Sequence, residues 1–218
     1  MGQPRHHGAG HRTSWLDTKK KTIRASEQDA AARAVWRQQA AQWDASELVF
    51  LDECGINTTL HRRYSRSQRG HRAEGVVPRN WQENTTVVGA LSATGVQAAM
   101  TIGGALDGIA FEVFIEQVLV PTLRPGQIVI MDNLSAHKNT RARQLAEAAG
   151  CRWEFLPAYS PDFNPIEQLW SKFKSDLRRE AARTQPALDN LVWPLLSSAT
   201  SQQARNWFNH CGYVVNDL

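Results

Sequence analysis

The sequence predicts an α/β protein whose core is one mixed β-sheet. Residues 48–51 (LVFL) and 128–131 (IVIM) are wholly apolar runs between polar residues, a pattern typical of strands buried on both faces. Residues 85–91 and 96–102 are two further β-type runs, and the Ser-Ala-Thr-Gly turn between them predicts a hairpin. Together with the first run they indicate an antiparallel meander, and helical patterns separate the later strands.

The remaining elements follow from helical periodicity and from the residues that stop it. Prolines and glycines at 121, 125, 126 and 150 mark the ends of two helices, and Ser26 is the expected N-cap of the first helix. Helices are expected at residues 26–43, 111–119, 139–149, 187–199 and 201–209, and a fifth strand is expected at 152–156.

Length and composition narrow the classes of function. The chain has 218 residues, of which 42% are hydrophobic and 21% charged, as in an ordinary globular protein. Its net charge of +4 permits a polyanionic partner such as nucleic acid. The three cysteines share no CxxC spacing, which argues against a disulfide framework or a zinc site and favours a reduced, cytoplasmic setting. No apolar run approaches the roughly 20 residues that a membrane span needs.

A loop with three prolines leads into the most distinctive helix of the chain. Pro157, Pro161 and Pro165 fix φ and exclude helix, so the segment up to Asn164 is expected to be an ordered loop. Asn164 is a good N-cap residue, and Pro165 suits the first helical position, where its missing N–H costs nothing. The helix is therefore expected to begin at this point.

This helix presents one apolar stripe and, beside it, one carboxylate. The stripe consists of Ile166, Leu169, Trp170, Phe173 and Leu177. Glu167 lies about 100° round from the stripe, in line with the basic Lys174 and Arg178. These residues alone leave two interpretations of Glu167 open. It is either the third residue of a capping box with Asn164 or a functional carboxylate at the rim of the buried face.

An acidic residue follows each of the two wholly apolar strands. Asp52 and Glu53 come after the first strand, and Asp132 comes after the second. A single aspartate in such a place is usually a turn former or a helix cap. In a sheet with parallel central strands, however, the carboxyl ends lie side by side, which is where ligands bind in such folds. Asp52 and Asp132 are therefore expected to meet there, with Glu167 arriving on the helix after the last strand.

Three carboxylates at one rim repel one another unless they are protonated or neutralised by cations. Oxygen ligands without a His or Cys cluster favour Mg²⁺ or Mn²⁺ over Zn²⁺. Two such ions, about 3.5 to 4 Å apart, would activate a water or a 3′-hydroxyl on one side of a phosphodiester and stabilise the leaving oxygen on the other. This arrangement predicts cleavage and rejoining of DNA strands.

The acidic residues and the proline loop resemble the three signature blocks of DDE transposases in the mariner superfamily, and most nearly those of the bacterial insertion-sequence 630 family. The blocks are Asp52-Glu53, Asp132-Asn133 with His137 downstream, and residues 156–167 (LPAYSPDFNPIE). The spacing fits as well, because 34 residues separate the second acid from the third. The resemblance covers roughly residues 18–210.

The resemblance implies a ribonuclease H-like fold, with three antiparallel and two parallel strands flanked by helices. It also implies that Asp52, Asp132 and Glu167 are the catalytic residues and hold two Mg²⁺ or Mn²⁺ ions. Five further residues match block positions that shape the site: Glu53, Asn133, His137, Tyr159 and Asn164.

Residues 61–72 (HRRYSRSQRGHR) are strongly basic, and two interpretations of them stay open. They form either a charged hairpin that faces solvent or one that contacts phosphates. The residues predicted to contact DNA are Arg62, Arg63, Arg66, Arg69, Arg72, Lys174 and Arg178.

The resemblance divides the chain into four parts. These are a basic flexible arm (1–25), a linker helix (26–45), the ribonuclease H-like catalytic domain (46–182) and C-terminal helices packed on that domain (183–218). Full-length relatives carry paired helix-turn-helix domains before the catalytic domain, whereas only about 45 residues precede the first strand here. An upstream helix-turn-helix protein, or a fused upstream frame, is therefore an expected partner.

The main hypothesis is a metal-dependent DNA transposase that cuts element ends and joins them to target DNA as a homodimer. An alternative is a truncated, catalytically silent remnant that binds DNA or dimerises and so regulates a complete transposase. A stand-alone nuclease of the same fold is a third interpretation. All three place the protein on DNA in the cytoplasm.

Overall fold

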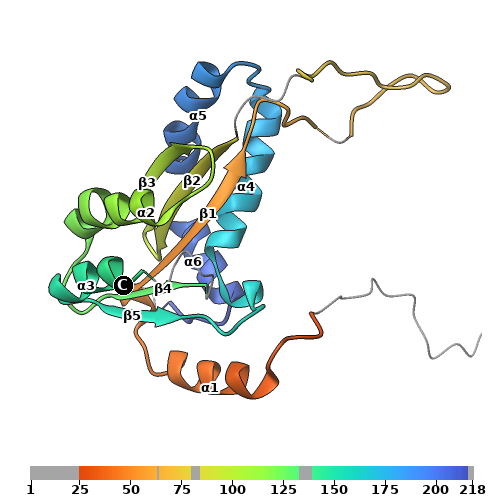
Figure 1. Cartoon of the computed structure of the whole chain (residues 1–218). Helices are drawn as coiled ribbons and strands as arrows, with labels where there is room; N and C mark the ends of the chain where they lie inside the picture. The colour runs from red at the N-terminus through yellow and green to blue at the C-terminus, as the bar shows by residue number, and fades with distance from the viewer. Residues whose placement is uncertain (1–24, 63, 80–83, 133–138, 216–218) are drawn as a thin grey trace, which may run out of the picture.

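A five-stranded mixed sheet forms the centre of the molecule, with helices on both of its faces (Figure 1). The computed structural model describes residues 25–62, 64–79, 84–132 and 139–215. The strands are β1 (Leu48–Ile56), β2 (Thr85–Ser92), β3 (Gly95–Gly103), β4 (Ile128–Met131) and β5 (Arg152–Phe155). Their order is β3-β2-β1-β4-β5; β1 to β3 are antiparallel, and β4 and β5 extend the sheet in parallel with β1. This is the predicted mixed sheet.

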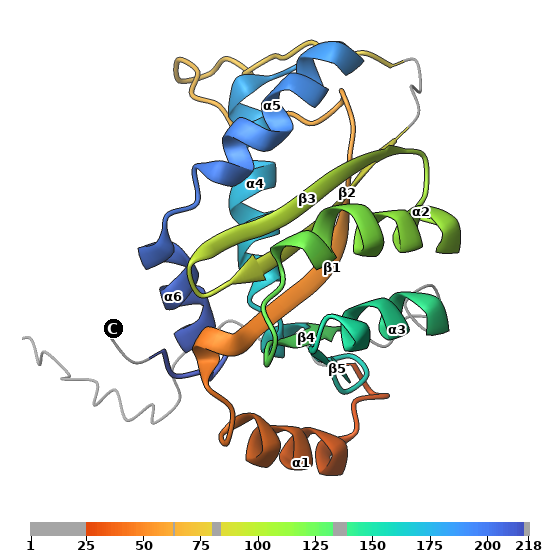
Figure 2. The ribbon, with the colours of Figure 1, turned by 90° about the vertical axis from the view of Figure 1, so that its left-hand side faces the viewer.

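The helices form a layer on each face of the sheet. The α-helices are α1 (Ala30–Ala40), α2 (Gly108–Val113), α3 (Thr140–Ala148), α4 (Ile166–Glu180), α5 (Gln185–Ser197) and α6 (Ser201–His210). Figures 1 and 2 show α2 and α3 on one face, and α4, α5 and α6 on the other. α1 lies beyond the β5 edge, and its Trp36 joins the core on the side of α4.

Side-chain alternation along the central strands decides which residues face which layer. Leu48 and Phe50 of β1, with Ile128 and Ile130 of β4, belong to the apolar cluster under α4, α5 and α6. The residues between them belong to the second cluster, under α2 and α3. Because both clusters are buried, each of the two apolar strands is buried on both faces, as predicted.

β1 is longer than the sequence predicts. It continues through Asp52 and Glu53 to Ile56, because β2 pairs with it as far as the Ile56–Thr85 pair. The two acids therefore lie inside a strand rather than beyond its end. The parallel pairing with β4 stops at Leu51, however, so Asp52 is still the first residue past that ladder.

The first helix and the crossover helix also differ from their predicted bounds. α1 is capped by Asp29, whose carboxylate accepts hydrogen bonds from two main-chain N–H groups at 2.8 and 3.0 Å, and not by Ser26. α2 begins at Gly108 after the cap Asp107 and continues as a π-helical segment, η2 (Phe114–Leu119). Pro121 lies inside the 3-10 turn that follows, η3 (Val120–Thr122), because a proline near the start of a turn loses no hydrogen bond.

Residues 61–79, which we call the arginine-rich segment, do not form the expected hairpin. None of the described residues in this range belongs to a strand, and most are exposed. The segment leaves the body of the molecule between β1 and β2 (Figure 1). The guanidinium of Arg183 fixes its base by donating hydrogen bonds to the main-chain oxygens of Thr58 and Leu60, at 3.1 and 2.8 Å.

α4 starts one residue later than expected, with Pro165 and not Asn164 at the N-cap. The side chain of Asn164 makes no capping bond, and its Oδ1 atom is buried without a hydrogen-bond partner among the described residues. The capping-box interpretation of Glu167 is therefore wrong. The predicted apolar stripe is confirmed, because each of its five side chains is no more than 3% exposed.

Trp170 lies across β2 at a position where a glycine leaves room for it. A Cβ atom on Gly89 would lie 2.8 Å from Cη2 of the indole, closer than carbon atoms approach in proteins. Gly89 pairs with Asp52 in the sheet, and Nε1 of Trp170 donates a hydrogen bond to Oδ2 of Asp52 at 3.0 Å. The missing side chain on β2 thus lets the indole reach a carboxylate on β1.

We predict that Gly89→Ala lowers the free energy of unfolding by about 1–3 kcal/mol, because the added methyl group displaces a buried indole from its hydrogen bond. Gly55→Ala is the matched control on the neighbouring strand, since a Cβ there meets nothing within 4 Å. Urea unfolding of both variants measures the difference. Equal stabilities would show that the indole adjusts without cost.

Candidate active site

Asp52 and Asp132 lie next to each other at the carboxyl end of the parallel strands. The last parallel pair is Leu51 and Met131, so each aspartate follows one member of that pair. Alternation turns Asp52 toward the same layer as Phe50, which is the layer that contains α4. The two side chains are thereby directed to one place by the register of the sheet.

The first turn of α4 brings Glu167 to the same place. Asp52, Asp132 and Glu167 all line one cavity of about 310 Å³. The three acids therefore meet as predicted, from β1, from the residue after β4 and from α4. The proline loop between β5 and α4 forms the rest of the cavity wall, through Leu156, Pro157, Ala158, Tyr159, Ser160, Pro161 and Asn164.

The carboxyl group of Asp52 is strongly perturbed. Its pKa is raised from the ordinary 3.8 to about 7, first by burial and then by the negative charges of Glu167, Glu53 and Asp132. A main-chain N–H hydrogen bond from Glu53 opposes the shift but does not cancel it. In the absence of a cation, Asp52 is therefore half protonated near neutral pH.

The pKa of Glu167 is also raised. Partial burial of its carboxylate raises its pKa, the positive charge of Lys174 lowers it, and the charges of Asp132 and Glu53 raise it again. Lys174 lies two turns further along α4 and stands on the predicted basic row. This lysine, predicted to contact DNA, is therefore close enough to affect a carboxylate of the cavity.

The chemistry of these ligands fits a divalent cation, although their present positions do not close around one. Among the described residues, no three His, Cys, Asp or Glu side chains stand in an arrangement that could hold a metal ion. The cavity nevertheless offers carboxylate oxygens whose mutual repulsion raises a pKa, and hard cations such as Mg²⁺ and Mn²⁺ neutralise such groups. One oxygen of Asp52 is held by the indole of Trp170.

The structure places two of the five predicted site-shaping residues in the cavity wall. Tyr159 and Asn164 line the cavity. Glu53 is not among the lining residues, because alternation turns it to the opposite face of β1 from Asp52, although its charge still raises the pKa of Asp52. Asn133 and His137 lie outside the described residues.

Two of the predicted DNA-contact residues come together at the far end of α4. Arg62 from the arginine-rich segment and Arg178 from α4 both line two neighbouring cavities of about 510 and 470 Å³, together with Arg179. Arg66, Arg69 and Arg72 are exposed on the segment itself, and Arg63 lies outside the described residues. The grouping of positive charge gives the segment and α4 one shared basic surface.

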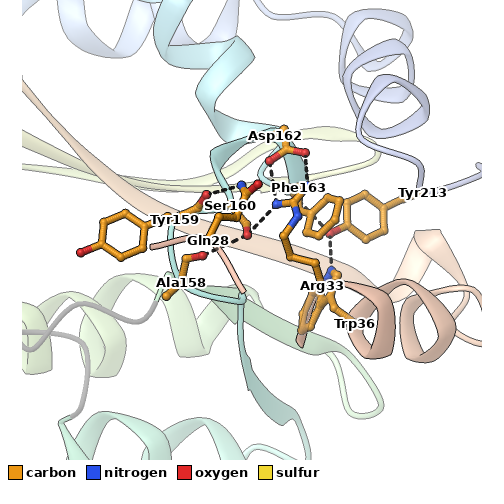
Figure 3. Close-up of polar contacts among 9 residues, drawn as sticks. All are labelled: Gln28, Arg33, Trp36, Ala158, Tyr159, Ser160, Asp162, Phe163 and Tyr213. Atoms are coloured by element: carbon orange, nitrogen blue, oxygen red, sulfur yellow. Dashed lines mark hydrogen bonds and ion pairs between the residues drawn. The ribbon is translucent and has the colours of Figure 1, made fainter. Parts of the chain in front are cut away.

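A clamp that the sequence did not predict connects α1 to the proline loop (Figure 3). Arg33 is only 9% exposed, and its guanidinium donates to Oγ of Ser160 at 2.7 Å and to both carboxylate oxygens of Asp162 at 3.0 and 2.6 Å. The same guanidinium lies 4.1 Å from the ring centroid of Phe163. The hydrogen bonds from Arg33 lower the pKa of Asp162, so this carboxylate stays ionised beside it.

The C-terminal part of the chain completes the clamp. The hydroxyl of Tyr213 donates to the main-chain oxygen of Phe163 at 2.8 Å and accepts from Nε1 of Trp36 at 3.1 Å. The sequence gives little signal for these contacts, since Arg33 and Ser160 are 127 positions apart in the chain. Most residues of α1 are exposed, and only the folded structure shows that Arg33 is buried along with Trp36.

Comparison with protein families agrees with this geometry. The profile of the DDE superfamily endonuclease family matches residues 47–189, and the chain belongs to this family. No match was found among curated proteins. The matched range includes all three acids and the proline loop.

Solved structures of Mos1 transposase share the fold. The Mos1 paired-end complex with the left transposon end has a TM-score of 0.70 at 14% identity, covering 92% of this chain and 65% of that chain. The Mos1 mariner paired end complex with Mg has a TM-score of 0.65 at 15% identity, over 90% and 64%. The catalytic domain of Mos1 mariner transposase alone has a TM-score of 0.55 at 11% identity, over 83% of both chains.

The present chain therefore spans slightly less than two thirds of the Mos1 chains in those complexes. These similarities show the fold, which is the ribonuclease H-like fold of transposase catalytic domains. Within the part of the chain that the structure describes, no helix has the length and apolar character needed to cross a membrane.

We predict that the ionisation of Asp52 makes stability depend on pH in metal-free buffer. Because its pKa is raised to about 7 from 3.8, the contribution of this group to stability is complete below pH 3.8 and is lost as the pH rises through 7. The amide oxygen of the Asp52→Asn variant can still accept the hydrogen bond from Trp170. The free energy of unfolding of this variant should exceed that of the parent by on the order of 2 kcal/mol at pH 8, and the two values should be equal near pH 4.

Urea unfolding at several pH values measures this difference, and Asp189→Asn, an exposed aspartate on α5, is the control. Parallel pH dependence of the parent and Asp52→Asn would contradict the assignment of the shifted pKa to Asp52.

Proposed function

We propose that this chain is the catalytic domain of a DDE transposase, of the insertion-sequence 630 family, that cleaves and transfers DNA strands with Mg²⁺ or Mn²⁺. The observation that supports this most strongly is that Asp52, Asp132 and Glu167, which match the three acids of the signature blocks, line one cavity. Membership of the DDE superfamily endonuclease family supports the same reaction class.

In this proposal Asp52, Asp132 and Glu167 hold two divalent ions. Bound there, the ions would activate the attacking water or 3′-hydroxyl and stabilise the leaving oxygen of the phosphodiester. Asp52 must be ionised to act as a ligand. A bound cation would favour the ionised form, because its positive charge would offset the burial and the neighbouring negative charges that raise the pKa of Asp52. The hydrogen bond from Trp170 fixes one oxygen of Asp52 and so orients this carboxylate, which lines the cavity.

The remaining residues would position DNA and complete the wall of the site. The basic surface formed by Arg62 and Arg178 lies along α4 from the cavity, so a strand entering the site would pass cations on the same helix. Lys174 lies between the two regions on α4. Asn164 and Tyr159 would shape the cavity, and Asn133 and His137 are proposed to do so by their place in the signature blocks.

The proposal also includes DNA and protein partners. Two of the Mos1 structures are described as paired end complexes, one of them with the left transposon end. By analogy, this chain would bind element ends and target DNA as a homodimer, with helix-turn-helix domains provided by an upstream protein or frame. The proposed catalytic domain comprises residues 46–182, after an arm (1–25) and a linker helix (26–45) and before the C-terminal helices (183–218).

We predict that the purified protein nicks supercoiled plasmid DNA in the presence of Mn²⁺, and that Glu167→Gln reduces nicking at least about 100-fold, because an amide is a poor ligand for a hard cation. Glu180→Gln is the matched control, since it makes the same change at an exposed position of the same helix. DNA binding by both variants should match the parent. A Glu167→Gln protein that cuts as well as the parent would show that the triad is wrongly assigned.

We also predict that replacing Arg62, Arg63 and Arg66 with Ala flattens the salt dependence of DNA binding, with a loss of about 1 to 3 units in the slope of log K against log salt. Replacement of Arg124, Arg143 and Arg152 removes the same charge elsewhere. Arg124 precedes β4 and Arg152 is the first residue of β5, so both lie at the other end of the parallel strands. Titrations at several salt concentrations measure both slopes. An unchanged slope for the first variant would mean that the arginine-rich segment only faces solvent.

A further inference from the structure

Tyr159 stands at the mouth of the active-site cavity with most of its side chain in solvent. It lines the cavity that contains the three acids, yet the residue is 59% exposed. Figure 3 shows its ring directed away from Arg33 and Phe163, so the clamp on the loop does not use the ring. An aromatic surface is thus presented to solvent beside the cavity that the three acids line.

The backbone at Tyr159 adopts a conformation that bulky residues avoid. Its φ is 56°, and Ala181 is the other non-glycine residue with positive φ among the described residues. Ala181 forms the left-handed cap at the end of α4, which is a common way for a helix to end. Tyr159 caps no helix, and glycine or asparagine would satisfy a turn of this kind with less strain.

Contacts on both sides hold this conformation in place. Nε2 of Gln28 donates to the main-chain oxygen of Tyr159 at 2.8 Å. The next residue, Ser160, is 5% exposed; its hydroxyl donates to the main-chain oxygen of Ala158 at 3.2 Å and accepts from Arg33. The backbone is therefore fixed by segments distant in sequence, while the ring remains free to bind.

We propose that Tyr159 is a stacking residue for an unpaired nucleobase of the DNA strand whose phosphate enters the carboxylate cavity. The inference rests on the proposed function, because a DNA strand must reach the cavity for a base to reach the ring. Aromatic faces bind bases of any sequence by stacking, and a base must leave the duplex stack to use such a surface. A rigid backbone with an exposed ring lowers the entropy lost on binding.

The ring, and not the hydroxyl, carries this role. Tyr159→Phe should therefore bind single-stranded DNA within twofold of the parent, whereas Tyr159→Ala should bind about 5- to 100-fold more weakly. The probe is a fluorescein-labelled dT20 oligonucleotide, measured by anisotropy in Mg²⁺ buffer. A second probe has the same backbone with abasic sites in place of the bases.

The abasic probe separates stacking from support of the loop. Tyr159→Ala should bind it within twofold of the parent, because no base is present to stack. Tyr159→Gly serves as a second variant, since glycine adopts a positive φ readily and relieves strain, and it should repeat the result of Tyr159→Ala. Trp193→Ala removes an exposed aromatic from α5 and should leave both affinities unchanged.

Three results would overturn the proposal. These are equal binding of dT20 by Tyr159→Ala and the parent, an equal loss on both probes, and no measurable binding of dT20 by the parent. Plasmid nicking by the parent and by Glu167→Gln is measured in parallel. Nicking that depends on Glu167, together with unchanged dT20 binding by Tyr159→Ala, rejects the stacking role alone, whereas nicking independent of Glu167 rejects the proposed function.

Discussion

Electrostatic repulsion among three carboxylates is the interaction on which the rest of the site depends. Asp52 lies in β1, Asp132 directly follows β4, and Glu167 lies in α4; the fold brings them to one cavity where burial and like charge raise the pKa of Asp52 to about 7. Bringing three carboxylates together in a partly buried cavity destabilises the folded state, so stability does not explain this arrangement. A bound cation would account for the arrangement, because the carboxylates could bind it together and its positive charge would cancel their repulsion.

The structure holds this unfavourable group of charges by packing around it. Gly89 makes room on β2 for the indole of Trp170, and the indole binds one oxygen of Asp52. On the other wall, Arg33 binds the loop that carries the cavity's remaining lining residues. α1 and the C-terminal segment around Tyr213 therefore contribute to the site although neither lines the cavity. Both constrain the loop between β5 and α4, which connects the last strand to Glu167.

Much of this fold was predictable because its signals are local. Wholly apolar runs such as Ile128–Met131 identify buried strands, and the stripe on α4 identifies its buried face. The approximate positions of the acids followed from parallel strands having their carboxyl ends together. The exact end of β1 was not predictable, because it depends on how far β2 pairs with it. The capping-box interpretation of Glu167 was wrong because it required the Asn164 side chain to accept a hydrogen bond from the first turn of α4. The Oδ1 atom of Asn164 is instead buried without a partner among the described residues.

The contacts that the sequence concealed are those between distant segments. Trp170 belongs to the apolar stripe, and nothing in its spacing indicates that Nε1 meets Asp52, 118 residues earlier. Arg33 is one of several arginines near the start of the chain, and only the folded loop distinguishes it. The positive φ of Tyr159 likewise has no sequence signature, since tyrosine is an unusual choice for that conformation.

Anomalous diffraction from crystals grown with Mn²⁺ is the decisive measurement. We expect manganese peaks inside the cavity, in contact with carboxylate oxygens of Asp52, Asp132 and Glu167. Crystals saturated with Mn²⁺ that show no manganese between these three side chains would contradict it.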